Sequence, residues 1–135
     1  MSFDHEKLDV YRLSIDFAAL AARLIETLKG DYRNIRDQLS RASQSVPLNI
    51  AEGNGKRSLV DRRHYFRIAR GSAMECAACL DVLRAIGACQ TEEVDSGKAL
   101  LVRVVAMLSR MSDDGGTARE DEAEYGGQSG GCEPG

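Results

Sequence analysis

Six basic side chains lie close together near the middle of the sequence and are opposed by a single acid, Asp61. Clustered cations bind phosphate groups, because each neutralised phosphate releases condensed counterions whatever the base sequence. Arg63, Arg67 and Arg70 have the spacing of residues on one helix face. A solvated face or a contact between subunits fits the same pattern equally well. The six candidate nucleic-acid-binding residues are Lys56, Arg57, Arg62, Arg63, Arg67 and Arg70.

Other patterns of reactive residues lack the partners that their chemistry requires. Cys76 and Cys79 form a CxxC on a continuous helical pattern, whereas structural zinc takes four ligands, and free cysteines pack as small hydrophobes. Asp61 and His64 have the spacing of a di-iron motif, but such sites need a second pair and two more carboxylates. The GNGKRS turn lacks the spacing of a phosphate-binding P-loop. We therefore predict no metal, no cofactor and no enzymatic activity.

The elements that position the basic residues are amphipathic helices. Apolar residues recur at steps of three and four over four segments, and only 5% of residues are aromatic. The predicted helices span residues 5–29, 32–52, 60–88 and 91–111. Short connections predict an all-α fold, an antiparallel up-down-up-down four-helix bundle.

The first helix carries more apolar residues than one stripe needs. The predicted core stripe contains Leu8, Tyr11, Ile15, Ala18, Ala22 and Ile25. A second apolar set lies off the stripes, and a monomer would leave it partly exposed. We expect this set to face a neighbouring subunit; it contains Phe3, Val10, Phe17, Leu24 and Leu59.

Residues 45–58, SVPLNIAEGNGKRS, place a proline inside the second helix. Proline removes one backbone hydrogen bond and crowds the preceding turn, at a cost of about 3 kcal/mol. The apolar stripe nevertheless keeps its register from Ile35 to Ile50. We predict a helix bent at Pro47 that ends through left-handed conformations at Gly53 and Gly55. In the third helix, small residues 71–73 are expected to admit a neighbouring backbone.

The charge is unevenly distributed along the chain. Residues 113–135 carry seven acids and one base, a net charge of −6, whereas the preceding residues carry +3. The last segment has too few apolar residues to offset chain entropy. We predict one helical domain, residues 1–112, followed by an acidic, Gly-rich, disordered tail, residues 113–135.

The sequence also indicates a cellular compartment. It has no apolar run near the ~18 residues of a membrane span, and its N-terminus is charged where a signal peptide is apolar. Three of the four cysteines lie within apolar helical patterns, which is not typical of a secreted disulfide framework. We expect a cytoplasmic protein without membrane association.

QLSRASQSVPLNIAEGNGKRS (38–58) followed by RRHYFRIARGSAMEC (62–76) resembles the signature of a known four-helix-bundle family. The family is named for proteins encoded in intervening sequences of bacterial 23S ribosomal RNA. The resemblance implies a ring oligomer, typically a homopentamer, with nucleic-acid binding as a candidate role. Accessory proteins of diversity-generating retroelements are distantly similar; they form pentameric basic barrels that bind a reverse transcriptase and its RNA.

The resemblance also marks polar residues. Asn49, Glu52 and Gly53 fall on the family's Asn-Ile-Ala-Glu-Gly segment, and residues 70–75 fall on its Arg-Gly-Ser-x-x-Glu segment. We expect a polar cluster that fixes helix register rather than a catalytic site. The predicted cluster contains Arg41, Asn49, Glu52, Arg70, Ser72 and Glu75.

Together these patterns favour a non-enzymatic homo-oligomer, a pentamer by resemblance. Its expected partners are copies of itself and RNA, DNA or a nucleic-acid-bound protein, contacted through the cations of the third helix. The alternative is a structural or protein-interaction scaffold that does not bind nucleic acid and whose basic face joins subunits.

Overall fold

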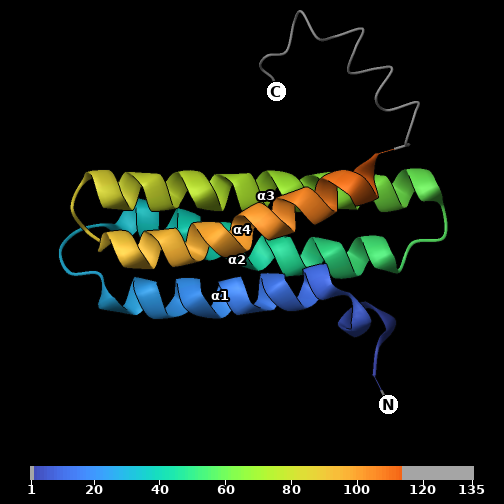
Figure 1. Ribbon diagram of the computed structural model, residues 1–135, viewed down its shortest axis with the longest axis horizontal. Coiled ribbons are helices and arrows are strands. Elements are labelled where there is room, and N and C mark those ends of the chain that lie inside the picture. Colours follow the sequence, from blue (N-terminus) through green and yellow to red (C-terminus); the bar gives the residue numbers. More distant parts are fainter. Residues whose placement is uncertain (1, 114–135) are drawn as a thin grey trace, which may run out of the picture.

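The computed structural model describes residues 2–113, and every regular element among them is helical (Figure 1). A short 3-10 helix, η1, precedes four α-helices. The elements are η1 (Asp4–Lys7), α1 (Asp9–Thr27), α2 (Arg33–Asn54), α3 (Leu59–Ala85) and α4 (Thr91–Ser112). The prediction of an all-α protein with four helices is confirmed for this part of the chain. Residues 114–135, most of the predicted tail, lie outside the described residues.

The four helices lie side by side, and in Figure 1 each runs back along the one before it. Each helix packs against its neighbours in the chain, and α1 closes the arrangement by packing against α4. The C-terminal ends of α2 and α4 therefore lie at the same end of the molecule, next to the start of α3 (Figure 1). None of the helices within residues 2–113 combines the length and the apolarity needed to cross a membrane.

Local chemistry explains most helix boundaries. Ser58 precedes α3, and its Oγ accepts a hydrogen bond from the Asp61 backbone N–H at 3.1 Å. Gln90 and Glu93 form a capping box at the start of α4. Gly87, with φ of 76°, follows α3 in the left-handed conformation that glycine adopts readily. The first helix begins later than predicted, because residues 4–7 form η1 and Leu8 is extended.

The role predicted for Gly53 and Gly55 is wrong. Gly53 lies inside α2, and Gly55 has φ of −84°, so neither uses a left-handed conformation. Gly53 is instead a point of close packing between α2 and α3. A Cβ there would lie 2.8 Å from Phe66 Cε1 and 3.0 Å from Tyr65 Cβ. This glycine is required for space rather than for backbone freedom.

The core follows the predicted stripe of α2, in which Leu39, Val46 and Ile50 are buried, but not that of α1. Val10, Phe17 and Leu24 are at most 3% exposed, whereas Ile15 from the predicted stripe is 42% exposed. Three members of the expected subunit-facing set therefore belong to the core of the single chain. Apolar residues lie on more than one face of α1, so spacing alone did not identify the buried face.

Two further expectations concern α2 and α3. Helix α2 continues through Pro47, which is buried in it, and Ser43 Oγ donates to the Ser40 carbonyl at 3.0 Å. Gly71 faces open space, because nothing lies within 4 Å of the position that a Cβ would take. Ala73 is fully buried. The close approach expected around residues 71–73 therefore does not occur at Gly71 within this chain.

Candidate nucleic-acid interface

Two arginines of α3, Arg67 and Arg70, contact the C-terminal end of α4. Arg67 Nη2 donates to the Ser112 carbonyl at 3.1 Å, and Arg70 Nη1 lies 3.5 Å from Ser109 Oγ. Arg63 is half-buried one turn earlier on the same helical face. The last carbonyls of a helix carry partial negative charge, so the Arg67 cation is stabilised where α4 ends.

Arg62 lies on the opposite flank of α3, where α2 ends. Its Nη1 donates to the Asn54 carbonyl at 2.9 Å and to the Lys56 carbonyl at 3.2 Å. Its guanidinium lies 5.8 Å from the centroid of the Phe66 ring, within the range of a cation–π contact. Arg62 therefore holds the α2–α3 turn closed.

The remaining two cations lie in the turn itself. Lys56 Nζ forms an ion pair with Glu52 Oε2 at 2.9 Å and lies 5.3 Å from the Tyr65 ring centroid. The hydrogen bond to Glu52 raises the pKa of Lys56. Arg57 is exposed and makes no hydrogen bond or ion pair with another residue in the described part of the chain. The structure thus divides the six predicted cations between two flanks of α3 and the turn that precedes it.

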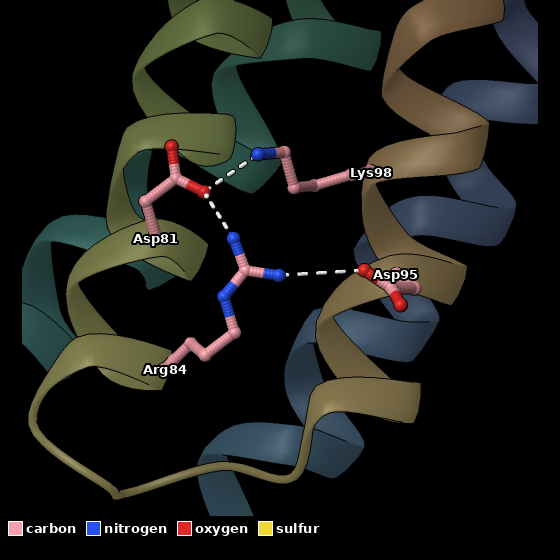
Figure 2. Close-up of polar contacts among 4 residues, drawn as sticks. All are labelled: Asp81, Arg84, Asp95 and Lys98. Carbon is pink, nitrogen blue, oxygen red and sulfur yellow. Dashed lines mark hydrogen bonds and ion pairs between the residues drawn. The ribbon is translucent and has the colours of Figure 1, made fainter.

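At the other end of α3 and α4, next to the turn that joins them, acidic and basic side chains pair with each other, as Figure 2 shows. The Asp81 carboxylate accepts from Lys98 Nζ at 2.6 Å and from Arg84 Nη2 at 3.5 Å, while Arg84 Nη1 lies 3.4 Å from Asp95 Oδ1. The hydrogen bond from Lys98 lowers the pKa of Asp81. Exposed pairs of this kind contribute little to stability, but they match acid to base across the two helices.

The sequence-based interpretation missed this ionic network. Its partners lie on two helices and are separated by up to 17 residues, so no single-helix pattern contains all of them. One available signal was the pair of opposite charges at i, i+3 on each side of the predicted turn. Those pairs are Asp81 with Arg84 and Asp95 with Lys98.

Two members of the predicted polar cluster lie together between α2 and α3. Asn49 Nδ2 donates to Ser45 Oγ at 3.0 Å, and Ser72 Oγ donates to the same oxygen at 2.8 Å. Ser45, which the prediction did not include in the cluster, is its centre. Its carbonyl also accepts from Asn49 Nδ2 at 2.9 Å. The bond between Ser72 and Ser45 joins α3 to α2 and fixes how the two helices are placed along each other, whereas the two Asn49 bonds lie within α2.

The other four members of that set lie elsewhere. Glu75 accepts a hydrogen bond from Gln38 at 3.2 Å, Glu52 pairs with Lys56, and Arg70 faces α4. Arg41 is exposed and makes no hydrogen bond or ion pair within the described residues. The six residues therefore do not form one site in this chain.

The cysteine and histidine patterns do not form a reactive centre. Cys76 and Cys79 are at most 2% exposed, and burial raises the pKa of Cys76 to about 12, so its thiol stays protonated near neutral pH. His64 and Asp61 are both exposed. Within residues 2–113, no three His, Cys, Asp or Glu side chains gather closely enough to hold a metal ion.

An apolar groove of about 460 Å³ runs between α3 and α4. Met74 and Ala77 form one wall, Val102 and Val105 the other, and Leu101 also lines it. Met74 is 57% exposed and Val102 is 67% exposed. Exposed apolar side chains that gather in one groove are typical of contact surfaces.

The comparisons with known proteins agree with the fold. The model of the family of 23S rRNA-intervening sequence proteins matches residues 6–110. The chain belongs to this family. The match confirms the resemblance found in residues 38–58 and 62–76 and extends it over all four helices. No curated protein matches the sequence.

One solved structure shares this fold. It is a protein of unknown function from the S23 ribosomal protein family of Bacteroides thetaiotaomicron VPI-5482. The TM-score is 0.72 at 22% sequence identity, and the alignment covers 77% of this chain and 98% of that chain. At this identity the likeness concerns the fold.

Proposed function

We propose that this protein is a non-enzymatic, homo-oligomeric helical bundle that binds RNA or DNA, alone or within a nucleoprotein, through the basic face of α3. The supporting observation is a set of arginines that meet no acid. Among the described residues, four of them form no ion pair with a carboxylate: Arg57, Arg62, Arg67 and Arg70.

The acceptors of these arginines explain why their charge remains available. Arg62 and Arg67 donate to backbone carbonyls, and Arg70 contacts a hydroxyl. A guanidinium has five N–H donors, so one bond to a carbonyl orients it while others remain for a phosphate. The cations near the α3–α4 turn differ, because Lys98 already forms an ion pair with Asp81 and Arg84 with Asp95 (Figure 2).

Charge-removing substitutions test this proposal. Replacing Arg57, Arg67 and Arg70 with Gln removes three cations but keeps much of each aliphatic stem. Each lost phosphate contact lowers the log–log salt slope by about 0.7 to 0.9, which corresponds to about 5- to 8-fold in affinity at 0.1 M salt. The triple variant should therefore bind about 100- to 500-fold more weakly there, measured by fluorescence anisotropy with labelled oligo(U) RNA and a DNA duplex.

A matched control removes three other exposed arginines by the same chemistry: Arg23, Arg33 and Arg103. This control should retain most of the affinity if the α3 face is the contact surface. Equal losses in both triple variants would indicate attraction by net charge alone. Wild-type protein that shows no salt-sensitive binding near 0.05 M salt would refute nucleic-acid binding and favour the scaffold.

Self-association is the second part of the proposal. We infer that antiparallel bundles, bent at Pro47, assemble into a ring, a pentamer by family resemblance. The apolar groove between α3 and α4 supports an interface there, since Met74 and Val102 are otherwise exposed to water. Phe3 and Leu59, at 68% and 56% exposure, are further apolar residues available to a neighbour.

A pair of charge insertions tests this interface. Val102→Glu in the groove should convert the oligomer to monomers, because it buries an unpaired carboxylate. Leu48→Glu is the matched control, since Leu48 on α2 is also 67% exposed but lies outside the groove. Native mass spectrometry of both variants gives the mass. A wild-type monomer at micromolar concentration, or dissociation by Leu48→Glu alone, contradicts the groove as the interface.

The scaffold remains the rival function, and one observation favours it. Arg67 and Arg62 already hold helix ends within the chain, so their presence does not require an external phosphate. We place the protein in the cytoplasm in either case. Cys76, Cys79 and Cys89 are free thiols, which suits a reducing compartment.

A further inference from the structure

The acidic segment begins at the basic face of α3. The carbonyl of Ser112, the last residue of α4, accepts a hydrogen bond from Arg67, and Arg70 lies beside Ser109. Ser112 is fully buried, with its Oγ donating to the Leu108 carbonyl at 2.6 Å, so the point from which the chain continues is fixed. The family match ends at residue 110, so it does not include the acidic segment.

We propose that residues 113–135 bind the basic face of α3 and compete there with nucleic acid. The proposal assigns an occupant to that face and rests on the proposed function only for the competition. Charge complementarity selects the occupant, because the segment carries −6 and the preceding residues carry +3. Arg62 and Arg67 donate to carbonyls and Arg70 contacts a hydroxyl, so these three guanidinium groups suit a neighbouring run of acids.

The length of the segment permits this contact. Its main acidic cluster, residues 120–124, begins eight residues after Ser112 and can reach about 26 Å from it in an extended chain. Arg57 precedes α3 by two residues, so it lies at most about 19 Å from Arg67, made up of about 12 Å of helix and up to about 7 Å of extended chain. The acids therefore reach every cation of the face without any movement of the four helices.

Tethering makes even a weak contact effective. A short linker holds its binding group at an effective concentration near 1 mM. If the free segment binds with a dissociation constant of about 0.1 to 0.5 mM, the tethered segment weakens nucleic-acid binding by about 3- to 10-fold. An acid that stays more than a Debye length, about 8 Å, from the face at physiological salt contributes little, so the effect requires contact.

Two full-length variants with equal charge changes test the proposal. Each replaces five acids with the corresponding amides, so folded helices and chain length are retained. The tail variant carries Asp114→Asn, Glu120→Gln, Asp121→Asn, Glu122→Gln and Glu124→Gln. The body variant carries the same chemistry at exposed positions away from the face: Asp16, Glu26, Asp31, Asp37 and Glu92. Affinity for labelled oligo(U) RNA is measured at about 0.1 M salt, where each phosphate contact still counts.

A second measurement does not involve nucleic acid. A fluorescent peptide of residues 113–135 is added to the tail variant under reducing conditions, and to the same variant carrying Arg57, Arg67 and Arg70 as Gln. We expect saturable, salt-sensitive binding to the first protein and at least a tenfold loss with the second. An amide version of the peptide should not bind.

The outcomes separate this inference from the proposed function. A 3- to 10-fold gain in RNA affinity for the tail variant alone, with peptide binding, supports the inference. No peptide binding, or equal gains in the tail and body variants, overturns it. Peptide binding with no RNA binding by any variant supports docking of the segment and refutes nucleic-acid binding as the function.

Discussion

Two glycine-to-alanine substitutions separate packing from helix propensity in this fold. A methyl group at Gly53 would lie 2.8 Å from Phe66 Cε1 and 3.0 Å from its Cδ1, closer than carbon atoms approach without repulsion. A methyl group at Gly71 would meet nothing within 4 Å. Both residues are helical, so alanine gains up to about 1 kcal/mol of helix propensity at each. Only Gly53→Ala also forces α2 and α3 apart.

The expected magnitudes follow from these distances. Overpacking costs about 1 to 3 kcal/mol, so Gly53→Ala should lower the free energy of unfolding by up to about 2 kcal/mol after the propensity gain. Gly71→Ala should raise it by about 0.5 to 1 kcal/mol. Urea denaturation followed by circular dichroism, at one fixed protein concentration, measures both values. The gain in helix propensity is nearly the same in both variants, so the difference between their free energies of unfolding reports mainly on packing at Gly53.

A double variant identifies the cause. Phe66→Leu removes the ring atoms nearest the new methyl group, so adding Gly53→Ala to it should cost clearly less than adding it to the wild type. An equal cost in both backgrounds would show that the Phe66 ring is not what limits position 53. If Gly53→Ala and Gly71→Ala stabilise the protein alike, the interpretation of Gly53 as a packing contact is refuted.

Two further predictions concern charge. Arg62→Gln should lower the free energy of unfolding by about 1 to 3 kcal/mol, because Arg62 Nη1 donates a hydrogen bond to the Asn54 carbonyl. Arg57→Gln should change the free energy of unfolding by less than about 0.5 kcal/mol. Thermal melts of the two variants compare these effects directly. The pKa of Cys76 rises from an ordinary value of 9.0 to about 12 through burial, so the unfolded chain loses this proton first. Stability should therefore be constant below about pH 9 and fall by about 1.4 kcal/mol per pH unit above it for this thiol, a slope that Cys76→Ala should reduce in urea titrations at several pH values.

The helices themselves were predictable because their sequence signals agree with one another. In α2 and α4 a single apolar stripe coincides with the buried face, and Ser58 and Gly87 lie at helix ends, where serine and glycine are favoured. In α1 the competing apolar faces left the spacing ambiguous. Only the presence of three neighbouring helices selects Phe17 over Ile15 as the core residue.

The candidate site was predictable in composition but not in arrangement. Spacing along one helix correctly groups Arg63, Arg67 and Arg70 on one face, but it gives no information about what that face meets. The acceptors belong to helix ends that are remote in the sequence, such as Ser112, 45 residues from its arginine. Ser45 was missed for the same reason, since its role depends on which residue of α3 lies opposite.

Arginines cap three of the four α-helix C-termini within residues 2–113. Each guanidinium comes from a later or neighbouring helix and donates to a carbonyl at the end of another. The contacts join Arg36 Nη2 to Leu28 at 3.1 Å, Arg62 Nη1 to Asn54 at 2.9 Å and Arg67 Nη2 to Ser112 at 3.1 Å. Helix α3 ends instead with a left-handed glycine, Gly87. A cation at a helix C-terminus meets both free carbonyls and the negative end of the helix dipole.

The direction of the helices gathers two of these caps at one end of the bundle. Helices α2 and α4 both finish beside the start of α3 (Figure 1), so Arg62 and Arg67 bring positive charge there as a consequence of folding. Part of the basic face would therefore exist without any partner. Arg57 differs, because among the described residues it forms no hydrogen bond with a helix end and no ion pair with an acid. Its substitution leaves every described contact intact, so a loss of nucleic-acid affinity in Arg57→Gln reports on binding and not on the fold.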